Sequence, residues 1–106
     1  MRHKLCDRDD VPRNGIIRVT DVPGFTGPMA VADSDGALFC VADTCSHQTA
    51  SLADGWVENG CVECPMHESR FDLATGKPDV PPARDAIATY PIEVVDGEVF
   101  VIGSGS

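Results

Sequence analysis

Positive charge is scarce in this chain. Eight Lys and Arg residues stand against seventeen Asp and Glu residues among 106, which gives a formal net charge of −9. Nucleic-acid binding depends on basic patches, so this charge balance argues against that class of function. It suits a soluble protein that meets positively charged partners.

Long apolar runs are also missing. No run approaches the roughly 20 residues that a membrane-spanning helix needs. The N-terminus, from Met1 to Asp7, has basic residues but no apolar stretch behind them, so it does not read as a secretory signal. We therefore expect a cytoplasmic protein without membrane contact. A length of 106 residues allows one modest core, so we expect residues 1–106 to form a single domain.

Helical periodicity is absent, because eight prolines and ten glycines punctuate the chain and no segment carries an apolar stripe of helical spacing. The sequence instead predicts an all-β fold, a small antiparallel β-sandwich or barrel in which residues 43–83 form an inserted, loop-rich subdomain. The expected main strands are 2–6, 16–20, 29–32, 37–42, 88–95 and 98–102. Shorter ones are expected near 61–64 and 70–72.

Five cysteines is an odd number, and a cytosolic chain favours metal ligation over disulfides. Cys6, Cys40 and Cys61 have no motif-like spacing, so we expect them to be small buried hydrophobic residues. Trp56 and Phe25 are expected to be packing residues.

Two short segments each offer one thiolate and one imidazole. Cys45 and His47 lie in the first, and Cys64 and His67 follow in the second. Such a set can hold one tetrahedral zinc ion, or a two-iron, two-sulfide cluster with both cysteines on one iron and both histidines on the other. Zinc fingers usually place both cysteines in one knuckle and both histidines in another, so the interleaving here weighs against zinc.

The spacing Cys45-x-His47-x16-Cys64-x2-His67 resembles the Rieske iron–sulfur motif. Similarity extends over essentially the whole chain, through the stretches 6–12, 52–56 and 71–77. On these residues the chain resembles the small Rieske-type ferredoxins of bacterial multicomponent aromatic ring-hydroxylating dioxygenases, of the biphenyl and carbazole dioxygenase type.

The resemblance implies a Rieske fold, with one [2Fe-2S] cluster bound in the 43–83 subdomain by the four residues above. It implies a monomeric one-electron carrier that engages two partners transiently. A flavoprotein reductase using NADH or NADPH would supply electrons, and the terminal oxygenase would receive them. The aromatic substrate would not touch this component, so the sequence does not identify it.

Departures from respiratory Rieske proteins are informative. Those proteins have a further cysteine in each loop, joined by a disulfide, where this chain has Ala50 and Met66. They also have a serine and a tyrosine after the second loop, where this chain has Ser69 and Phe71. Loss of the tyrosine hydroxyl removes a hydrogen bond that would favour the reduced state, which predicts a midpoint potential on the order of −150 mV.

Two other functions are compatible with the ligand pattern. One is the Rieske small subunit of another reductase, such as an assimilatory nitrite reductase. The other is a zinc-stabilised interaction module. An enzyme acting alone is not expected, because the chain has no GxGxxG nucleotide fingerprint and His3 is its only remaining histidine.

Overall fold

A computed structural model of the chain describes residues 2–25, 27–43, 51–63, 70–80 and 87–102. These residues form eleven strands and two short 3₁₀ turns, η1 at Arg8–Asp10 and η2 at Leu52–Asp54. The strands are β1 Arg2–Asp7, β2 Ile16–Val19, β3 Met29–Ser34, β4 Ala37–Ala42, β5 Trp56–Glu58, β6 Cys61–Glu63, β7 Arg70–Asp72, β8 Pro78–Val80, β9 Thr89–Tyr90, β10 Ile92–Val95 and β11 Glu98–Ile102. No helix within these ranges is long and apolar enough to cross a membrane.

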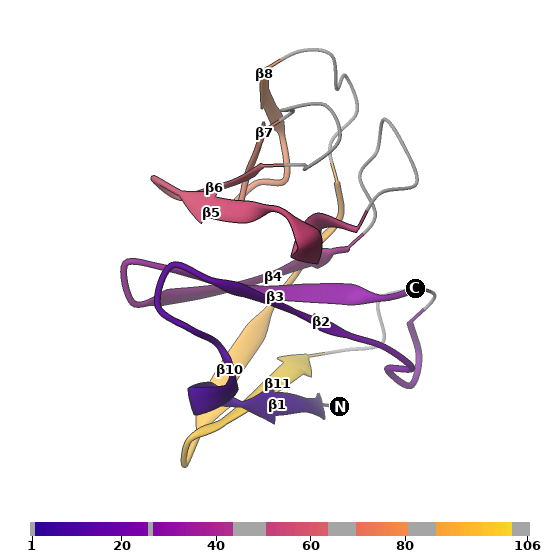
Figure 1. Cartoon of the computed structure of the whole chain (residues 1–106). Coiled ribbons are helices and arrows are strands. Elements are labelled where there is room, and N and C mark those ends of the chain that lie inside the picture. The colour runs from indigo at the N-terminus through magenta and orange to yellow at the C-terminus, as the bar shows by residue number, and fades with distance from the viewer. Residues whose placement is uncertain (1, 26, 44–50, 64–69, 81–86, 103–106) are drawn as a thin grey trace.

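Three antiparallel sheets are stacked in layers (Figure 1). The central sheet has the strand order β2-β3-β4-β9. The lower sheet, β1-β11-β10, pairs the two ends of the chain, with Arg2 opposite Ile102. The upper sheet, β5-β6-β7-β8, lies wholly within residues 56–80. The predicted all-β antiparallel fold is confirmed, whereas the division at 43 and 83 stays a prediction.

The central sheet is buried on both faces, and the alternation along β3 shows why. Ala30 and Ala32 face an upper core shared with the upper sheet, while Met29 and Val31 face a lower core shared with the lower sheet. Since successive strand residues point to opposite faces, a strand between two layers needs apolar residues at both parities. All six residues of β3 are accordingly buried.

Tight turns with positive φ angles join three of the hairpins. Asp35-Gly36, Asn59-Gly60 and Asp96-Gly97 each have both central residues at positive φ, the conformation of type I′ turns. Two of these hairpins match the prediction. The third joins β5 to β6, and its Asn59-Gly60 signal was available in the sequence although β5 was not predicted.

The expected strand 88–95 is two strands. β9 pairs with β4 in the central sheet, and β10 pairs with β11 in the lower sheet. Pro91 lies between them, where the chain passes from one sheet to the other. Proline has no N–H for a ladder, so this position suits a change of partner strand.

Burial of the isolated cysteines is only partly as expected. Cys40 is buried at 2% exposure, and its Sγ lies 3.8 Å from the Met29 Sδ. Cys6 and Cys61 are partly exposed, which corrects the expectation for both. Phe25 packs in the lower core, edge to face on Tyr90. Trp56 was expected to be a packing residue too, but it is 46% exposed and belongs to neither core.

Candidate metal centre

The four predicted ligands, Cys45, His47, Cys64 and His67, lie outside the described residues. Within the described ranges, no three His, Cys, Asp or Glu side chains come together as a metal site. The structure does describe the residues that flank the two ligand segments, and we call these flanking residues the frame. Contacts within the frame show whether the two segments begin and end close to one another.

The second ligand segment connects two paired strands, β6 and β7. β6 ends at Glu63 and β7 begins at Arg70, and these two residues are directly opposite in the antiparallel ladder. Opposed residues in such a ladder have Cα atoms about 4.5–5.5 Å apart. Cys64 directly follows the first of them, so Cys64 and His67 belong to a short connection with closely spaced ends.

The first ligand segment is anchored by Asp43, whose side chain is 1% exposed. Its Oδ2 accepts a hydrogen bond from the Ser51 hydroxyl at 2.5 Å, and its Oδ1 accepts one from the Ala53 amide at 2.8 Å. Its backbone carbonyl accepts a bond from the Leu52 amide at 2.6 Å. The residue before the segment is thus bonded to three residues after it.

Gly55 joins the frames of the two segments. It follows η2, and a Cβ at this position would lie 1.8 Å from the Glu63 carbonyl oxygen. Only glycine allows so close a backbone approach without displacement. The chain leaving the first ligand segment therefore rests against the residue that precedes Cys64.

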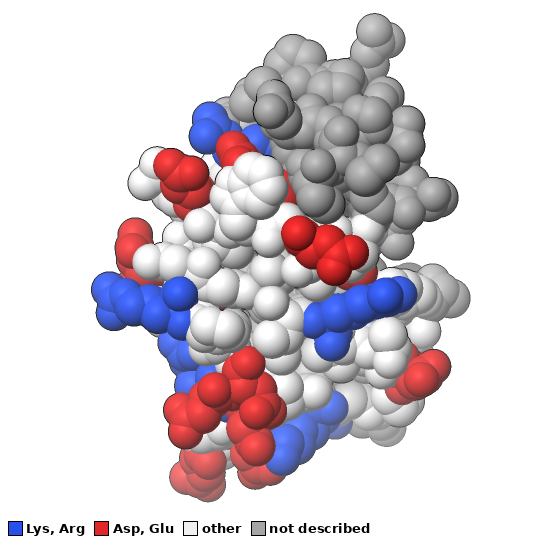
Figure 2. Space-filling view, in the orientation of Figure 1, with Lys and Arg blue, Asp and Glu red and all other residues white. Residues whose placement is uncertain are grey.

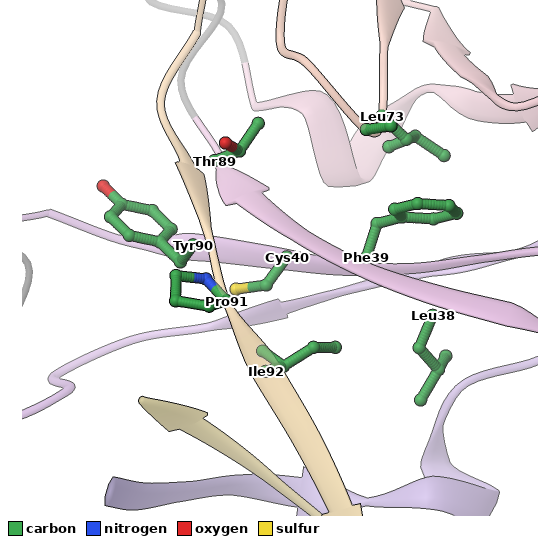
Figure 3. Close-up of a pocket in the computed structure, with 9 residues that line it drawn as sticks. Leu38, Phe39, Cys40, Leu73, Thr89, Tyr90, Pro91 and Ile92 are labelled. Carbon is green, nitrogen blue, oxygen red and sulfur yellow. The ribbon is translucent and has the colours of Figure 1, made fainter. Parts of the chain in front are cut away.

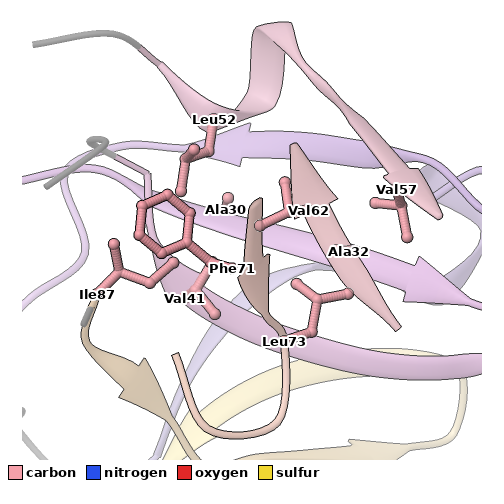
Figure 4. Close-up of a cluster of buried hydrophobic side chains, with 9 residues drawn as sticks. All are labelled: Ala30, Ala32, Val41, Leu52, Val57, Val62, Phe71, Leu73 and Ile87. Atoms are coloured by element: carbon pink, nitrogen blue, oxygen red, sulfur yellow. The ribbon is translucent and has the colours of Figure 1, made fainter. Parts of the chain in front are cut away.

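The upper core holds these frames in place from below (Figure 4). Leu52 comes from the end of the first segment and Phe71 from the end of the second, and both are fully buried there with Val41 and Val62. Ile87, which follows the undescribed residues 81–86, joins the same core at 6% exposure. One apolar contact network thus positions three chain segments at the same end of the molecule.

Gly76 fixes the approach of Ile87. The Gly76 carbonyl accepts a hydrogen bond from the Ile87 amide at 2.8 Å, and Gly76 has a φ of +77°. A Cβ on Gly76 would lie 2.1 Å from the Ile87 carbonyl oxygen. This glycine therefore has both a conformational and a steric requirement.

Elsewhere, an open groove of about 390 Å³ lies where β4, β9 and β10 meet, beneath the turn at Leu73 (Figure 3). Its lining is mostly apolar, with Leu38, Phe39 and Ile92 among the residues. The titratable groups in it are Cys40 and Tyr90, and burial raises the pKa of both, to about 12 for Cys40. Both groups therefore stay protonated at neutral pH.

The described residues define a class of protein: a small layered β domain in which the residues that flank two sequence segments lie together, and each of these segments contains one cysteine and one histidine. The donor set suits a two-iron cluster with mixed ligation, and the joined frames suit ligands that must converge. Residues 1–91 match the family model of the Rieske [2Fe-2S] domain. The chain belongs to this family, and its cofactor is a Rieske-type [2Fe-2S] cluster.

Ferredoxin subunits of dioxygenases are among the relatives of this chain. The chain is 46% identical over 74 residues to the anthranilate 1,2-dioxygenase ferredoxin subunit of Burkholderia cepacia, covering 70% of this chain and 68% of that protein. It is 39% identical over 98 residues to the 3-phenylpropionate/cinnamic acid dioxygenase ferredoxin subunit of Photorhabdus laumondii, covering 92% and 90%. The chain is therefore an electron-transfer component rather than a catalytic subunit.

A solved structure supports the same conclusion. The chain matches a chain in the complex of reduced oxygenase and oxidized ferredoxin of carbazole 1,9a-dioxygenase, with a TM-score of 0.88 and 32% identity, covering 99% of this chain and 95% of that one. The sequence motif predicts the ligand residues, and it did not single out Asp43, Gly55 or Gly76. Asp43 could have been noticed as a carboxylate placed between an apolar strand and Cys45.

Proposed function

We propose that this chain is the ferredoxin of an aromatic ring-hydroxylating dioxygenase system, with Cys45, His47, Cys64 and His67 as cluster ligands. It accepts single electrons from a flavoprotein reductase that oxidises NADH or NADPH, and it delivers them to the terminal oxygenase. Bound at this site, the cluster supplies reversible one-electron chemistry. The observation that carries the proposal is the match, at 39% identity over 92% of the chain, to a dioxygenase ferredoxin subunit.

The chain's own residues would contribute position and surface. The residues that flank both ligand segments are connected through Asp43, Gly55 and the upper core, which supports the proposal that the two segments converge on one cluster. The surface carries mixed charges with an acidic excess, and Figure 2 shows one group of acidic side chains at the bottom of the view, with others spread higher up. A net charge of −9 favours encounter with basic faces of partner proteins.

The shuttle role further implies a monomer that works in the cytoplasm and binds both partners transiently. A transient electron-transfer interface is small, below about 1,200 Å² in total. Size-exclusion chromatography of the purified chain, alone and with each partner, tests this part. A stable complex with a larger reductase at micromolar concentration would instead support a permanent subunit, as in a nitrite reductase.

Rebuilding the electron chain tests the function. The purified holoprotein is mixed with NADH or NADPH, a ferredoxin reductase and the oxygenase of an aromatic dioxygenase system, and electron arrival at the oxygenase is followed by its absorbance. We expect transfer to need this chain and to cease with a Cys64→Ser variant, while Gly97→Ala, at the far hairpin, serves as the matched control. No reduction of the chain by any flavoprotein reductase would contradict the proposal.

A further inference from the structure

Two aspartates are buried at opposite ends of the central sheet. Asp33 and Asp43 are each 1% exposed, and each pairs with an arginine that reaches solvent. Arg8 Nη2 lies 2.6 Å from Asp33 Oδ2, and Arg18 Nε lies 3.3 Å from Asp43 Oδ2. The two pairs are similar in chemistry and burial, and they differ in what lies next to them.

Asp43 is two residues before Cys45, so their Cα atoms are at most about 7 Å apart. Asp33 pairs with Leu38 near one end of the β3–β4 ladder. Met29 pairs with Ala42 at the other end, and Asp43 directly follows Ala42 in the chain. Four residues of strand separate the two ends, which corresponds to about 13 Å. The Coulomb interaction weakens with distance, so a charge at Asp43 acts on a group held by Cys45 more strongly than one at Asp33.

The sign of that effect follows from charge. Reduction adds one negative charge at the cofactor, and a nearby carboxylate opposes this while a nearby guanidinium favours it. Asp43 is enclosed by the Ser51 hydroxyl and the Ala53 amide, whereas the Arg18 side chain is 54% exposed and better screened by water. The buried charge should therefore have the larger effect.

We propose that Asp43 is a positioning residue of the first ligand segment that also lowers the midpoint potential of the cluster, and that Arg18 partly offsets this lowering. The inference rests on the proposed ligand set, because it requires Cys45 to bind the cluster. It deepens the electron-carrier function by naming residues outside the ligand motif that set the driving force of transfer.

Redox titration of four holoprotein variants, at one pH and one salt concentration, tests the inference. Asp43→Asn keeps an acceptor for the Ala53 amide and removes the charge, so the midpoint potential should rise. Arg18→Gln should lower it by a smaller amount. Asp33→Asn and Arg8→Gln are the matched controls, and each should shift the potential by less than its counterpart.

The outcomes separate the inference from the function beneath it. If Asp43→Asn folds poorly, Arg18→Gln decides alone, since it alters an exposed side chain and keeps the buried carboxylate. Equal shifts in Asp43→Asn and Asp33→Asn, a rise in Arg18→Gln, or four unchanged potentials would overturn the inference. A Cys45→Ser variant that retains the native cluster would overturn the proposed ligand set as well. Loss of the cluster in that variant would support the ligand set, so that an unchanged potential in Asp43→Asn would then count only against the role of Asp43.

Discussion

Replacing Gly76 by alanine tests whether close backbone approach holds the frame of the metal centre. Gly76 and Gly97 both have a φ of +77°, so alanine at either position meets the same left-handed strain, about 1–2 kcal/mol. They differ in space. A Cβ on Gly76 would lie 2.1 Å from the Ile87 carbonyl oxygen, whereas nothing lies within 4 Å of a Cβ on Gly97.

The difference can be given a magnitude. Real Cβ atoms essentially never approach other atoms within 3.0 Å, so the Ile87 carbonyl must retreat from 2.1 Å by 0.9 Å or more. This movement strains the 2.8 Å hydrogen bond from the Ile87 amide to the Gly76 carbonyl, which contributes about 1 kcal/mol. It also disturbs the packing of Ile87 in the upper core, at a cost of about 1–3 kcal/mol.

We therefore expect Gly76→Ala to lower the free energy of unfolding by about 2 kcal/mol or more beyond the loss in Gly97→Ala. Urea unfolding of both holoproteins, followed by circular dichroism, measures this difference. The cluster absorbance recorded in parallel should disappear at lower urea in Gly76→Ala. Equal midpoints for the two variants would refute the idea that Gly76 is required for its contact with Ile87.

Three further predictions concern individual side chains. Phe71→Ala should lower the free energy of unfolding by about 3–5 kcal/mol. Val94→Ala, at a 47% exposed site, should lower it by less than about 1 kcal/mol. Similar losses for the two variants in urea unfolding would contradict the burial of Phe71 in the upper core. The Gly36 amide, followed by the Asn14 amide and Arg8, holds the pKa of Asp33 below its usual value, so its stabilisation is present above about pH 4 and is lost as pH falls through the folded-state pKa. Unfolding midpoints measured down to low pH should fall less steeply in Asp33→Asn, and parallel curves would argue against this. Burial raises the pKa of Cys40 from 9.0 to about 12, so the stabilisation from the buried neutral thiol is present below pH 9 and is lost as pH rises toward 12. Peptide mapping after iodoacetamide treatment at pH 8 should therefore find Cys40 modified only in denaturant.

Local signals predicted much of the fold. The hairpin around Asp35-Gly36 and the terminal hairpin around Asp96-Gly97 follow from alternating apolar residues flanking a turn that favours positive φ. The break at Pro91 was missed because periodicity does not report which sheet a strand joins. The pairing within the lower sheet joins residues distant in sequence, such as Arg2 with Ile102, and local pattern does not specify this register.

The site shows the same division. Cys45, His47, Cys64 and His67 could be predicted as ligands because ligand chemistry imposes fixed residue types at fixed spacing. The residues that hold the frame were not predicted, because the sequence alone does not distinguish a buried aspartate or a crowded glycine from an ordinary loop residue. Their roles became visible only from the 2.8 Å bond of Asp43 and the close approach at Gly55.

Pulsed electron paramagnetic resonance of the reduced protein tests the central claim most directly, because unpaired spin on an iron couples to nitrogen nuclei bound to it. The protein is prepared with ¹⁵N-labelled histidine, alongside an unlabelled sample. The account predicts a two-iron, two-sulfide cluster with strong couplings to two imidazole nitrogens, from His47 and His67, that change with the label. A colourless protein holding one zinc ion, or a cluster without directly bound nitrogen, would contradict it.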